Sequence, residues 1–150
     1  MKKLFLLMLM CLMALVGCKE APVDLEIHSF DIHGTSEDVD GIPQIRYWEN
    51  GGYFYLTWNV DPESLYHVKL FIEDQRFYQQ NCGTGDPYKC QSRKANTCFL
   101  TANGVISCGD GQELDISYLL GVSVTLRLTL EACKYNSTDC DSITRLVRFN

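Results

Sequence analysis

Cysteine is the residue type in this 150-residue sequence with the widest chemistry. A thiol can form a disulfide, bind a metal, act as a nucleophile or carry a lipid. Eight cysteines occur, and two of them, Cys11 and Cys18, belong to an apolar N-terminal stretch. If the chain is exported to an oxidising compartment, the even number of remaining cysteines predicts three disulfides. The six remaining cysteines are Cys82, Cys90, Cys98, Cys108, Cys133 and Cys140.

One pairing follows from a predicted hairpin between Cys98 and Cys108. The turn residues at 102–104 are typical of a three-residue loop with Gly104 in the left-handed conformation. This register places the two cysteines opposite each other. A two-residue loop would instead turn them to opposite faces of the hairpin. A disulfide between Cys98 and Cys108 therefore predicts the three-residue loop.

The other pairings depend on the remaining four cysteines. Cys133 ends one predicted strand and Cys140 precedes the next, so a disulfide between them would close that turn. Cys82 and Cys90 are then left to pair with each other. These last two can alternatively exchange partners with the two hairpin cysteines.

Metal binding and catalysis are not expected from the pattern of ligands. Structural zinc uses cysteines two to four residues apart, whereas the gaps here are seven, seven and nine residues. The sequence shows no carboxylate and nucleophile in a triad-like pattern around His28, His33 or His67. The acidic segment 36–41 begins like a calcium loop, but its twelfth position is Tyr47 instead of Glu. We expect a solvated acidic turn there, and no enzyme, metal or cofactor.

Aromatic side chains are the candidates for binding another molecule. Tyr53 and Tyr55 share the strand face opposite the one that carries Trp58. Outward tyrosines can simply stabilise cross-strand pairs. They can also form a patch that binds a protein or a glycan, since Tyr and Trp are common interface anchors. The aromatic set of interest is Tyr47, Trp48, Tyr53, Tyr55, Phe77 and Tyr78, and its first four members are the candidate binding residues.

Alternation of apolar and polar residues predicts strands over 53–60 and 122–132. A single helical turn is expected at 117–121, and no longer helix. About seven short strands joined by turns predict one all-β domain over 23–150, an antiparallel β-sandwich. Weaker strands are expected over 23–33, 44–49, 66–73, 76–80 and 142–149.

The N-terminus resembles a bacterial lipoprotein signal. Lys2 and Lys3 precede an apolar run over 4–16, shorter than the about 20 residues that span a bilayer but right for a signal peptide. The run ends in Leu15-Val16-Gly17-Cys18, which is similar to the lipobox of that family. The resemblance implies cleavage before Cys18, a diacylglycerol on its thiol and an acyl group on the new amine. Several acyl chains hold a protein stably to a membrane.

The lipobox resemblance divides the chain and suggests a location. Residues 1–17 are the signal peptide, and 18–22 are the lipidated cysteine and a short tether. Lys19 is not the Asp that favours inner-membrane retention in this family, so the outer membrane of the cell envelope is expected. The net charge of −6 becomes more negative when the two leader lysines are removed. Such a surface repels nucleic acid and anionic lipid, so attachment to the membrane should come from the anchor.

Two segments resemble fibronectin type III and related immunoglobulin-like domains. Residues 55–62, Tyr-Leu-Thr-Trp-Asn-Val-Asp-Pro, are similar to the second strand of that family, where an inward Trp anchors the core. Residues 128–133, followed by Cys140 and a last strand, resemble the final hairpin of bacterial modules. The resemblance implies an immunoglobulin/fibronectin III-like sandwich. The disulfide-rich segment 81–113 would be an insertion, because the family does not require it.

These features predict a lipoprotein of the cell envelope that binds and does not catalyse. Its partner would be another envelope protein, a glycan or another ligand. The alternative is a periplasmic enzyme inhibitor or accessory subunit that acts through the cysteine-rich loop 82–108.

Overall fold

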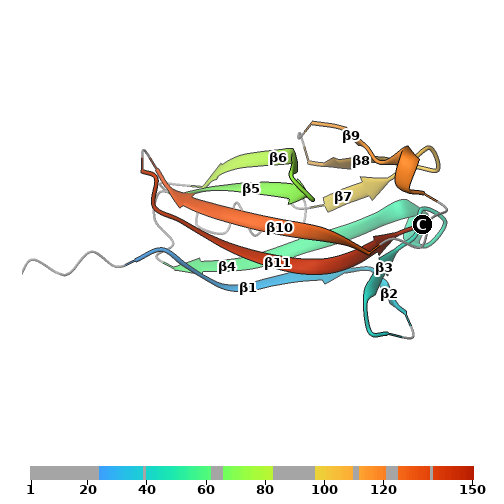
Figure 1. Cartoon of the computed structure of the whole chain (residues 1–150), viewed down its shortest axis with the longest axis horizontal. Helices are drawn as coiled ribbons and strands as arrows, with labels where there is room; N and C mark the ends of the chain where they lie inside the picture. Colours follow the sequence, from blue (N-terminus) through green and yellow to red (C-terminus); the bar gives the residue numbers. More distant parts are fainter. Residues whose placement is uncertain are drawn as a thin grey trace, which may run out of the picture.

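The computed structural model describes residues 24–38, 40–61, 66–82, 97–109, 112–120, 125–135 and 137–150. Two β-sheets face each other as a sandwich, and one hydrophobic core lies between them (Figure 1). The all-β prediction is therefore confirmed.

The first sheet has the order β1-β4-β7-β8-β9, with antiparallel neighbours throughout. Its strands are β1 (Glu26–His33), β4 (Tyr53–Asp61), β7 (Thr97–Leu100), β8 (Val105–Cys108) and β9 (Leu114–Asp115).

The second sheet has the order β2-β3-β11-β10-β5-β6. Its pairs are antiparallel except for β3 and β11, which run parallel, so the expectation of a purely antiparallel sandwich was wrong at this pair. The strands are β2 (Ser36–Glu37), β3 (Pro43–Ile45), β5 (Tyr66–Ile72), β6 (Gln75–Cys82), β10 (Thr125–Lys134) and β11 (Cys140–Phe149). Two single helical turns accompany the sheets, η1 (Asn50–Gly52) and η3 (Ser117–Leu119).

The apolar faces of the longest strands build the core. Alternate residues of β4 and β10 point inward, and burying each large apolar side chain contributes about 1.5–3 kcal/mol. None of these inward residues is more than 4% exposed: Phe54, Leu56, Trp58, Val60, Leu126, Leu128, Leu130 and Ala132. The inward faces predicted for 53–60 and for the described part of 122–132 are thus confirmed.

A bulge adapts β1 to the same core. Ile27 and Phe30 are both buried although they are three residues apart, which strict alternation does not allow. The register with β4 shifts between Ile27 and Ser29, so one extra residue is accommodated there. His28 is the extra residue, and its side chain remains 42% exposed.

Side chains of β11 close the free edge of β1. The Asp141 carboxylate accepts the Ile27 N–H at 2.8 Å, and the Arg145 guanidinium donates to the Phe30 carbonyl at 3.0 Å. Both backbone groups would otherwise be available to a foreign strand. These contacts therefore join the two sheets along this side and protect an edge.

The Cys98–Cys108 hairpin forms as predicted. Cys98 and Cys108 are direct cross-strand partners and are bonded to each other. The Thr101 N–H donates to the Val105 carbonyl at 2.9 Å, and Gly104 has a φ of +78°. The loop between Thr101 and Val105 consequently has three residues, because this length puts both cysteines on one face.

Two strand predictions need correction. The strand expected over 44–49 is the shorter β3, because the chain turns after Ile45 and the Glu49 N–H donates to the Arg46 carbonyl at 3.1 Å. The described residues form eleven strands where about seven were expected. Two of the additional four, β7 and β8, form the hairpin predicted from the cysteines, and the other two, β2 and β9, are two-residue strands with too little sequence for periodicity. Residues 121–124 lie outside the described chain, so the start of the 122–132 strand is not assessed.

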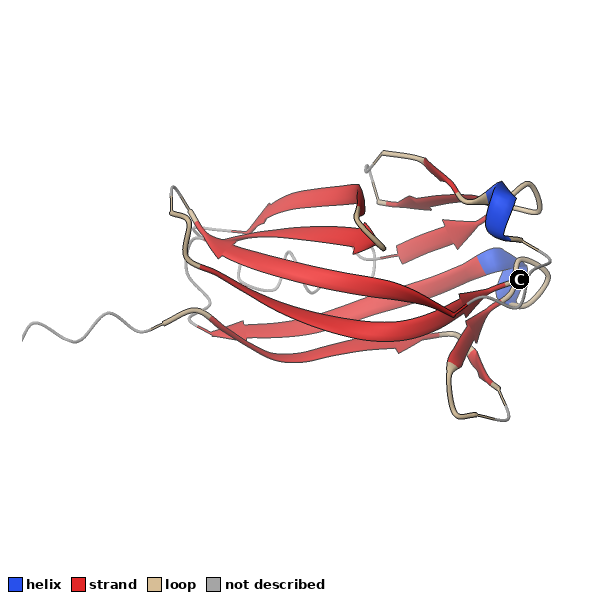
Figure 2. Cartoon of the chain, viewed as in Figure 1, coloured by secondary structure: helices blue, strands red, loops and turns tan. Residues whose placement is uncertain are grey.

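The sandwich has two distinct ends. The chain enters β1 at the end where β10 turns into β11, at the left of Figure 1. The C-terminus and both helical turns lie at the other end (Figure 2). Gly104, at the tip of the β7–β8 hairpin, packs against Ser117 of η3 at that end.

Gly52 offers a test of this packing. It has a φ of +81°, and an added Cβ would lie 2.2 Å from the Leu100 carbonyl oxygen. We expect Gly52→Ala to destabilise the domain by about 3 kcal/mol or more, through backbone displacement and strain together. Gly41→Ala is the matched control, because Gly41 has a φ of +74° with no atom within 4 Å of the added Cβ. Urea unfolding should show a loss of about 1 kcal/mol there. Equal losses for the two variants would contradict the packing described.

Candidate functional site

The four predicted aromatic residues lie around the end of the sandwich that carries the C-terminus. Tyr47 and Trp48 occupy the turn between β3 and η1, while Tyr53 and Tyr55 are outward residues of β4. Tyr47, Trp48 and Tyr53 are 39%, 58% and 47% exposed. Tyr55 is less exposed than these three because it is half-buried, and its ring lies next to Gly34. Three of the four are thus strongly available to a partner, whereas Phe77 and Tyr78 are buried in the core.

Tyr47 and Trp48 form one aromatic pair. Their ring centroids are 4.8 Å apart and the rings are nearly perpendicular, the edge-to-face arrangement that aromatic quadrupoles favour. The Tyr47 N–H donates to the Asn150 carbonyl at 2.9 Å, which fixes this turn against the C-terminus. The two rings are therefore held in place although they face solvent.

Arg46 orders the same turn through its guanidinium. It lies 6.0 Å from the centre of the Trp48 ring, within cation–π range. It also donates to Gln44 Oε1 at 3.0 and 2.8 Å, and to Glu49 Oε1 at 2.6 Å. Four side chains thus restrict one another, and the conformational entropy that a partner must remove on binding is smaller.

The hydrogen bond from Arg46 lowers the pKa of the Glu49 carboxyl. The Ser36 hydroxyl contributes in the same direction, and partial burial opposes both. Glu49 therefore remains ionised below the pH at which an ordinary glutamate is protonated. Its charge keeps Arg46 in position near Trp48 over that range.

Tyr53 and Phe99 form the second aromatic pair. Their ring centroids are 4.8 Å apart across the β4–β7 register. Gly52 allows this contact, because its missing side chain leaves room for Phe99. No ring contact within the described part of the chain joins this pair to Tyr47 and Trp48. The structure therefore produces two pairs linked through η1.

Two aromatic residues at this end were missed from sequence. Phe99 lies on the outer face of the hairpin. The only sequence signal for this orientation is its position between Cys98 and Leu100, which both point inward. Tyr118 lies on η3 and is 65% exposed. Its helical turn was predicted, but its proximity to the other aromatics depends on how the hairpin tip packs. Exposed aromatic groups of this kind can bind another molecule by apolar contact and stacking.

The cysteines form two disulfides within the described chain, Cys98–Cys108 and Cys133–Cys140, both as predicted. The first is buried in the core, and the second lies on the outer face of the second sheet. Cys82 ends β6, and Cys90 lies outside the described residues, so their pairing stays a prediction.

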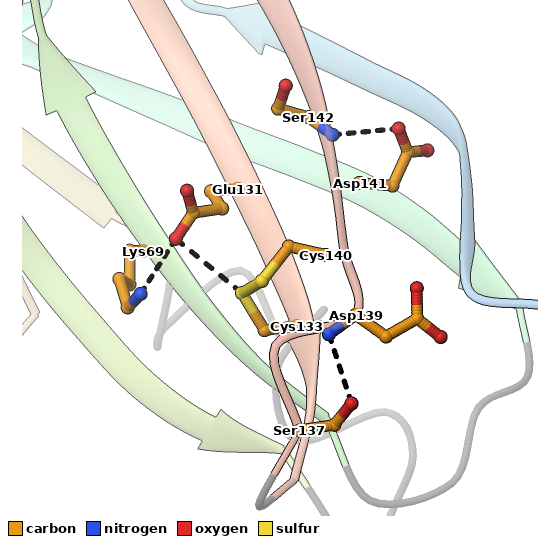
Figure 3. Close-up of a disulfide and its surroundings, with 8 residues drawn as sticks. All are labelled: Lys69, Glu131, Cys133, Ser137, Asp139, Cys140, Asp141 and Ser142. Atoms are coloured by element: carbon orange, nitrogen blue, oxygen red, sulfur yellow. Dashed lines mark hydrogen bonds and ion pairs between the residues drawn. A yellow bond between two sulfur atoms is a disulfide. The ribbon is translucent and has the colours of Figure 1, made fainter.

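One cluster in the described chain has ligand types suited to a metal. Glu131, Cys133 and Cys140 offer ligand atoms within 4.8 Å of one another. However, the two sulfurs are bonded to each other, and the Lys69 ammonium lies 2.7 Å from Glu131 Oε1 (Figure 3). A metal requires free thiolates. In its disulfide form this cluster therefore does not suit a metal.

The histidines His28 and His33 and the acidic segment 36–41 contact neighbouring side chains of the sandwich. His33 Nε2 lies 2.8 Å from Thr57 Oγ1, and His28 lies 3.6 Å from the Asp61 carboxylate. Arg148 lies between Asp38 and Asp40 of the acidic segment and forms ion pairs with both. The segment 36–41 is consequently tied to β11, and the expectation of a purely solvated turn was wrong for Asp38, which is 18% exposed.

Several predicted functional residues lie outside the described chain. They include the signal peptide, Cys18 and the tether, as well as residues 83–96 of the cysteine-rich loop. Within the described residues, no helix has the length and apolar character needed to cross a membrane. Comparison with models of protein families, with curated proteins and with solved structures gave no match.

The depressed pKa of Glu49 gives a testable pH dependence. A carboxyl group whose pKa is lower in the folded chain than in the unfolded chain stabilises the fold at pH values above its unfolded pKa. This contribution is lost as the pH falls through the folded pKa. We expect the NMR signal of the Trp48 indole N–H to stay constant through the ordinary glutamate range and to shift only at lower pH. Trp48→Phe assigns the signal.

Glu49→Gln should abolish this shift and give a different Trp48 signal already at neutral pH. Glu26→Gln is the control, because Glu26 is 70% exposed and lies at the other end of the sandwich. A titration that is unchanged in Glu49→Gln would mean that Glu49 does not order the turn.

Proposed function

We propose that this protein is a lipid-anchored binding module of the bacterial cell envelope, whose aromatic end contacts another protein. One observation carries the proposal. Of the five exposed aromatic residues in the described chain, four lie on or next to η1 and η3, and these turns are at the end of the sandwich away from the point where the chain enters β1 (Figure 2). The four are Tyr47, Trp48, Tyr53 and Tyr118. Cys18 precedes that point, so an anchor there would leave the aromatic end facing away from the membrane.

The length of the tether supports this orientation. Six chain steps lead from the lipobox cysteine Cys18 to the first described residue, Asp24, with five residues between them. They span at most about 20 Å at ~3.5 Å per residue. The β1 end of the domain would therefore stay near the bilayer, and the opposite end would be the one accessible to a large partner.

The strand order supports an immunoglobulin-like class for the domain. The neighbours β1-β4-β7-β8 correspond to strands A-B-E-D of that fold, and β5-β10-β11 to strands C-F-G, with β6 added beside β5. Trp58 on β4 is an inward core residue, as in the resemblance noted above. One departure is that β8 follows β7 in the chain, whereas strand D precedes strand E.

The residue types favour a protein as the partner. Trp, Tyr and Arg are the residues most enriched among binding hot spots, and all three occur in the ordered turn of Arg46, Tyr47 and Trp48. The turn is held by hydrogen bonds before any partner arrives, which reduces the entropic cost of association. A glycan that stacks on the same rings is the competing outcome.

The anchor is tested by Cys18→Ala. We expect this variant to leave the membrane fraction, because a single unacylated chain of this charge has nothing else to hold it there. The matched control is Cys11→Ala inside the leader, which should stay in the membrane fraction. Mass spectrometry of the wild-type N-terminal peptide should show acylation at Cys18. An unacylated mature N-terminus would refute the anchor.

The binding end is tested by photocrosslinking in the intact envelope. A photoreactive phenylalanine analogue at position 48 or 53 should yield an adduct of discrete mass that protease treatment removes. The same analogue at position 135 is the control, because Tyr135 is 56% exposed at the opposite end. Adducts at 135 alone, or equally at all three positions, would overturn the assignment. An adduct that resists protease and is lost with glycosidase would replace the protein partner with a glycan.

A further inference from the structure

The two described disulfides differ in their exposure to solvent. Cys98 and Cys108 are 0% and 1% exposed and belong to the core between the sheets. Cys133 is 1% exposed, but its partner Cys140 is an exposed residue at the start of β11. An external thiolate must reach a sulfur in order to attack it. Only the Cys133–Cys140 bond therefore combines one accessible residue with one protected residue.

Charged and titratable groups surround the protected sulfur. Glu131 Oε1 lies 3.5 Å from Cys133 Sγ, and the Lys69 ammonium lies 2.7 Å from the same oxygen (Figure 3). Lys69 thus offsets the negative charge that Glu131 would present to a thiolate at Cys133. His67 is the direct partner of Cys133 across the β5–β10 register.

His67 is a further titratable group on this surface. Burial, and then the charge of Lys69, lower the pKa of its imidazole, while Glu131 acts in the opposite direction. The imidazole therefore stays neutral to lower pH than an ordinary histidine and adds no positive charge beside Cys133 at neutral pH.

We propose that the Cys133–Cys140 disulfide is a site of thiol–disulfide exchange that accepts two electrons from a small-molecule dithiol in the same compartment. This site lies at the opposite end from the aromatic residues and does not depend on the binding function proposed above. Exposure assigns Cys140 as the sulfur that is attacked and Cys133 as the leaving thiolate.

The exchange proceeds in two displacements. A thiolate of the dithiol attacks Cys140 Sγ and forms a new S–S bond. The Cys133–Cys140 bond breaks, its electron pair stays on Cys133 Sγ, and this sulfur takes up a proton. The second thiolate of the dithiol then attacks its own partner sulfur in the mixed disulfide and releases Cys140 as a thiolate. The dithiol leaves as a disulfide, two electrons poorer, and this protein holds two thiols.

The hairpin retains other contacts when this bond is reduced. β10 and β11 stay paired over the whole register from Thr125 and Arg148 to the cysteines. At the turn, the Lys134 N–H donates to the Asp139 carbonyl at 3.0 Å, and the Lys134 ammonium lies 2.6 Å from the Asp139 carboxylate. The disulfide can therefore open and close without unfolding the strands that position it.

Selective reduction is the first test. The full chain is incubated with increasing dithiothreitol, quenched with an alkylating reagent and mapped by mass spectrometry. We expect Cys133 and Cys140 to be labelled at a concentration at least about tenfold below that needed for Cys98 and Cys108, with unchanged circular dichroism. Joint reduction of both bonds, or earlier reduction of Cys98–Cys108, would overturn the proposal.

Trapping is the second test, and it identifies which of the two sulfurs is attacked. Cys133→Ser leaves Cys140 as a free thiol, and Cys140→Ser is the matched variant that leaves Cys133. With oxidised glutathione, Cys133→Ser should form the mixed disulfide at least about tenfold faster than Cys140→Ser. Equal rates would contradict the assignment of Cys140. If either variant fails to fold, the wild-type titration above still decides.

Lys69→Met tests the surroundings of the leaving sulfur. Without the ammonium, Glu131 would present an uncompensated charge to the Cys133 thiolate, so reduction of the wild-type bond should slow several-fold. An unchanged rate of reduction in Lys69→Met, measured at neutral pH, would mean that Lys69 has no part in the exchange.

Discussion

The structure depends on two long strands whose alternate residues are all apolar and must be removed from water together. β4 contributes Leu56 and Trp58, and β10 contributes Leu128 and Leu130, from opposite sheets. Neither strand can bury this row alone, so the two sheets must face each other. Every outward residue, including those of both candidate sites, gets its direction from this packing.

Polar contacts then decide how the sheets are closed and where loops are fixed. Asp141 and Arg145 bind backbone groups of β1 and join the two sheets along one side. Arg148 holds the acidic segment through Asp38 and Asp40. These charged side chains act on defined partners, so part of the chain's acidity has a structural role. They also leave the end around η1 free to present aromatic rings.

The two ends of the sandwich thus carry different chemistry on one scaffold. At one end a disulfide with an exposed cysteine lies beside Glu131 and Lys69. At the other end Trp48 and Tyr53 face solvent from an ordered turn and a strand. The strands run the full distance between these ends, so each site can be altered without changing the other. The experiments above use this separation, with residues at one end as controls for the other.

Local sequence patterns are sufficient to predict the strictly alternating strands, the inward Trp58 and the loop length that pairs Cys98 with Cys108, because these follow from a period of two and from a glycine at a turn. The bulge at His28, the parallel pairing of β3 with β11 and the contact of Tyr53 with Phe99 emerge only in the folded chain. Those features join segments far apart in the chain, and no local pattern of hydrophobicity records which distant side chain fills a given space.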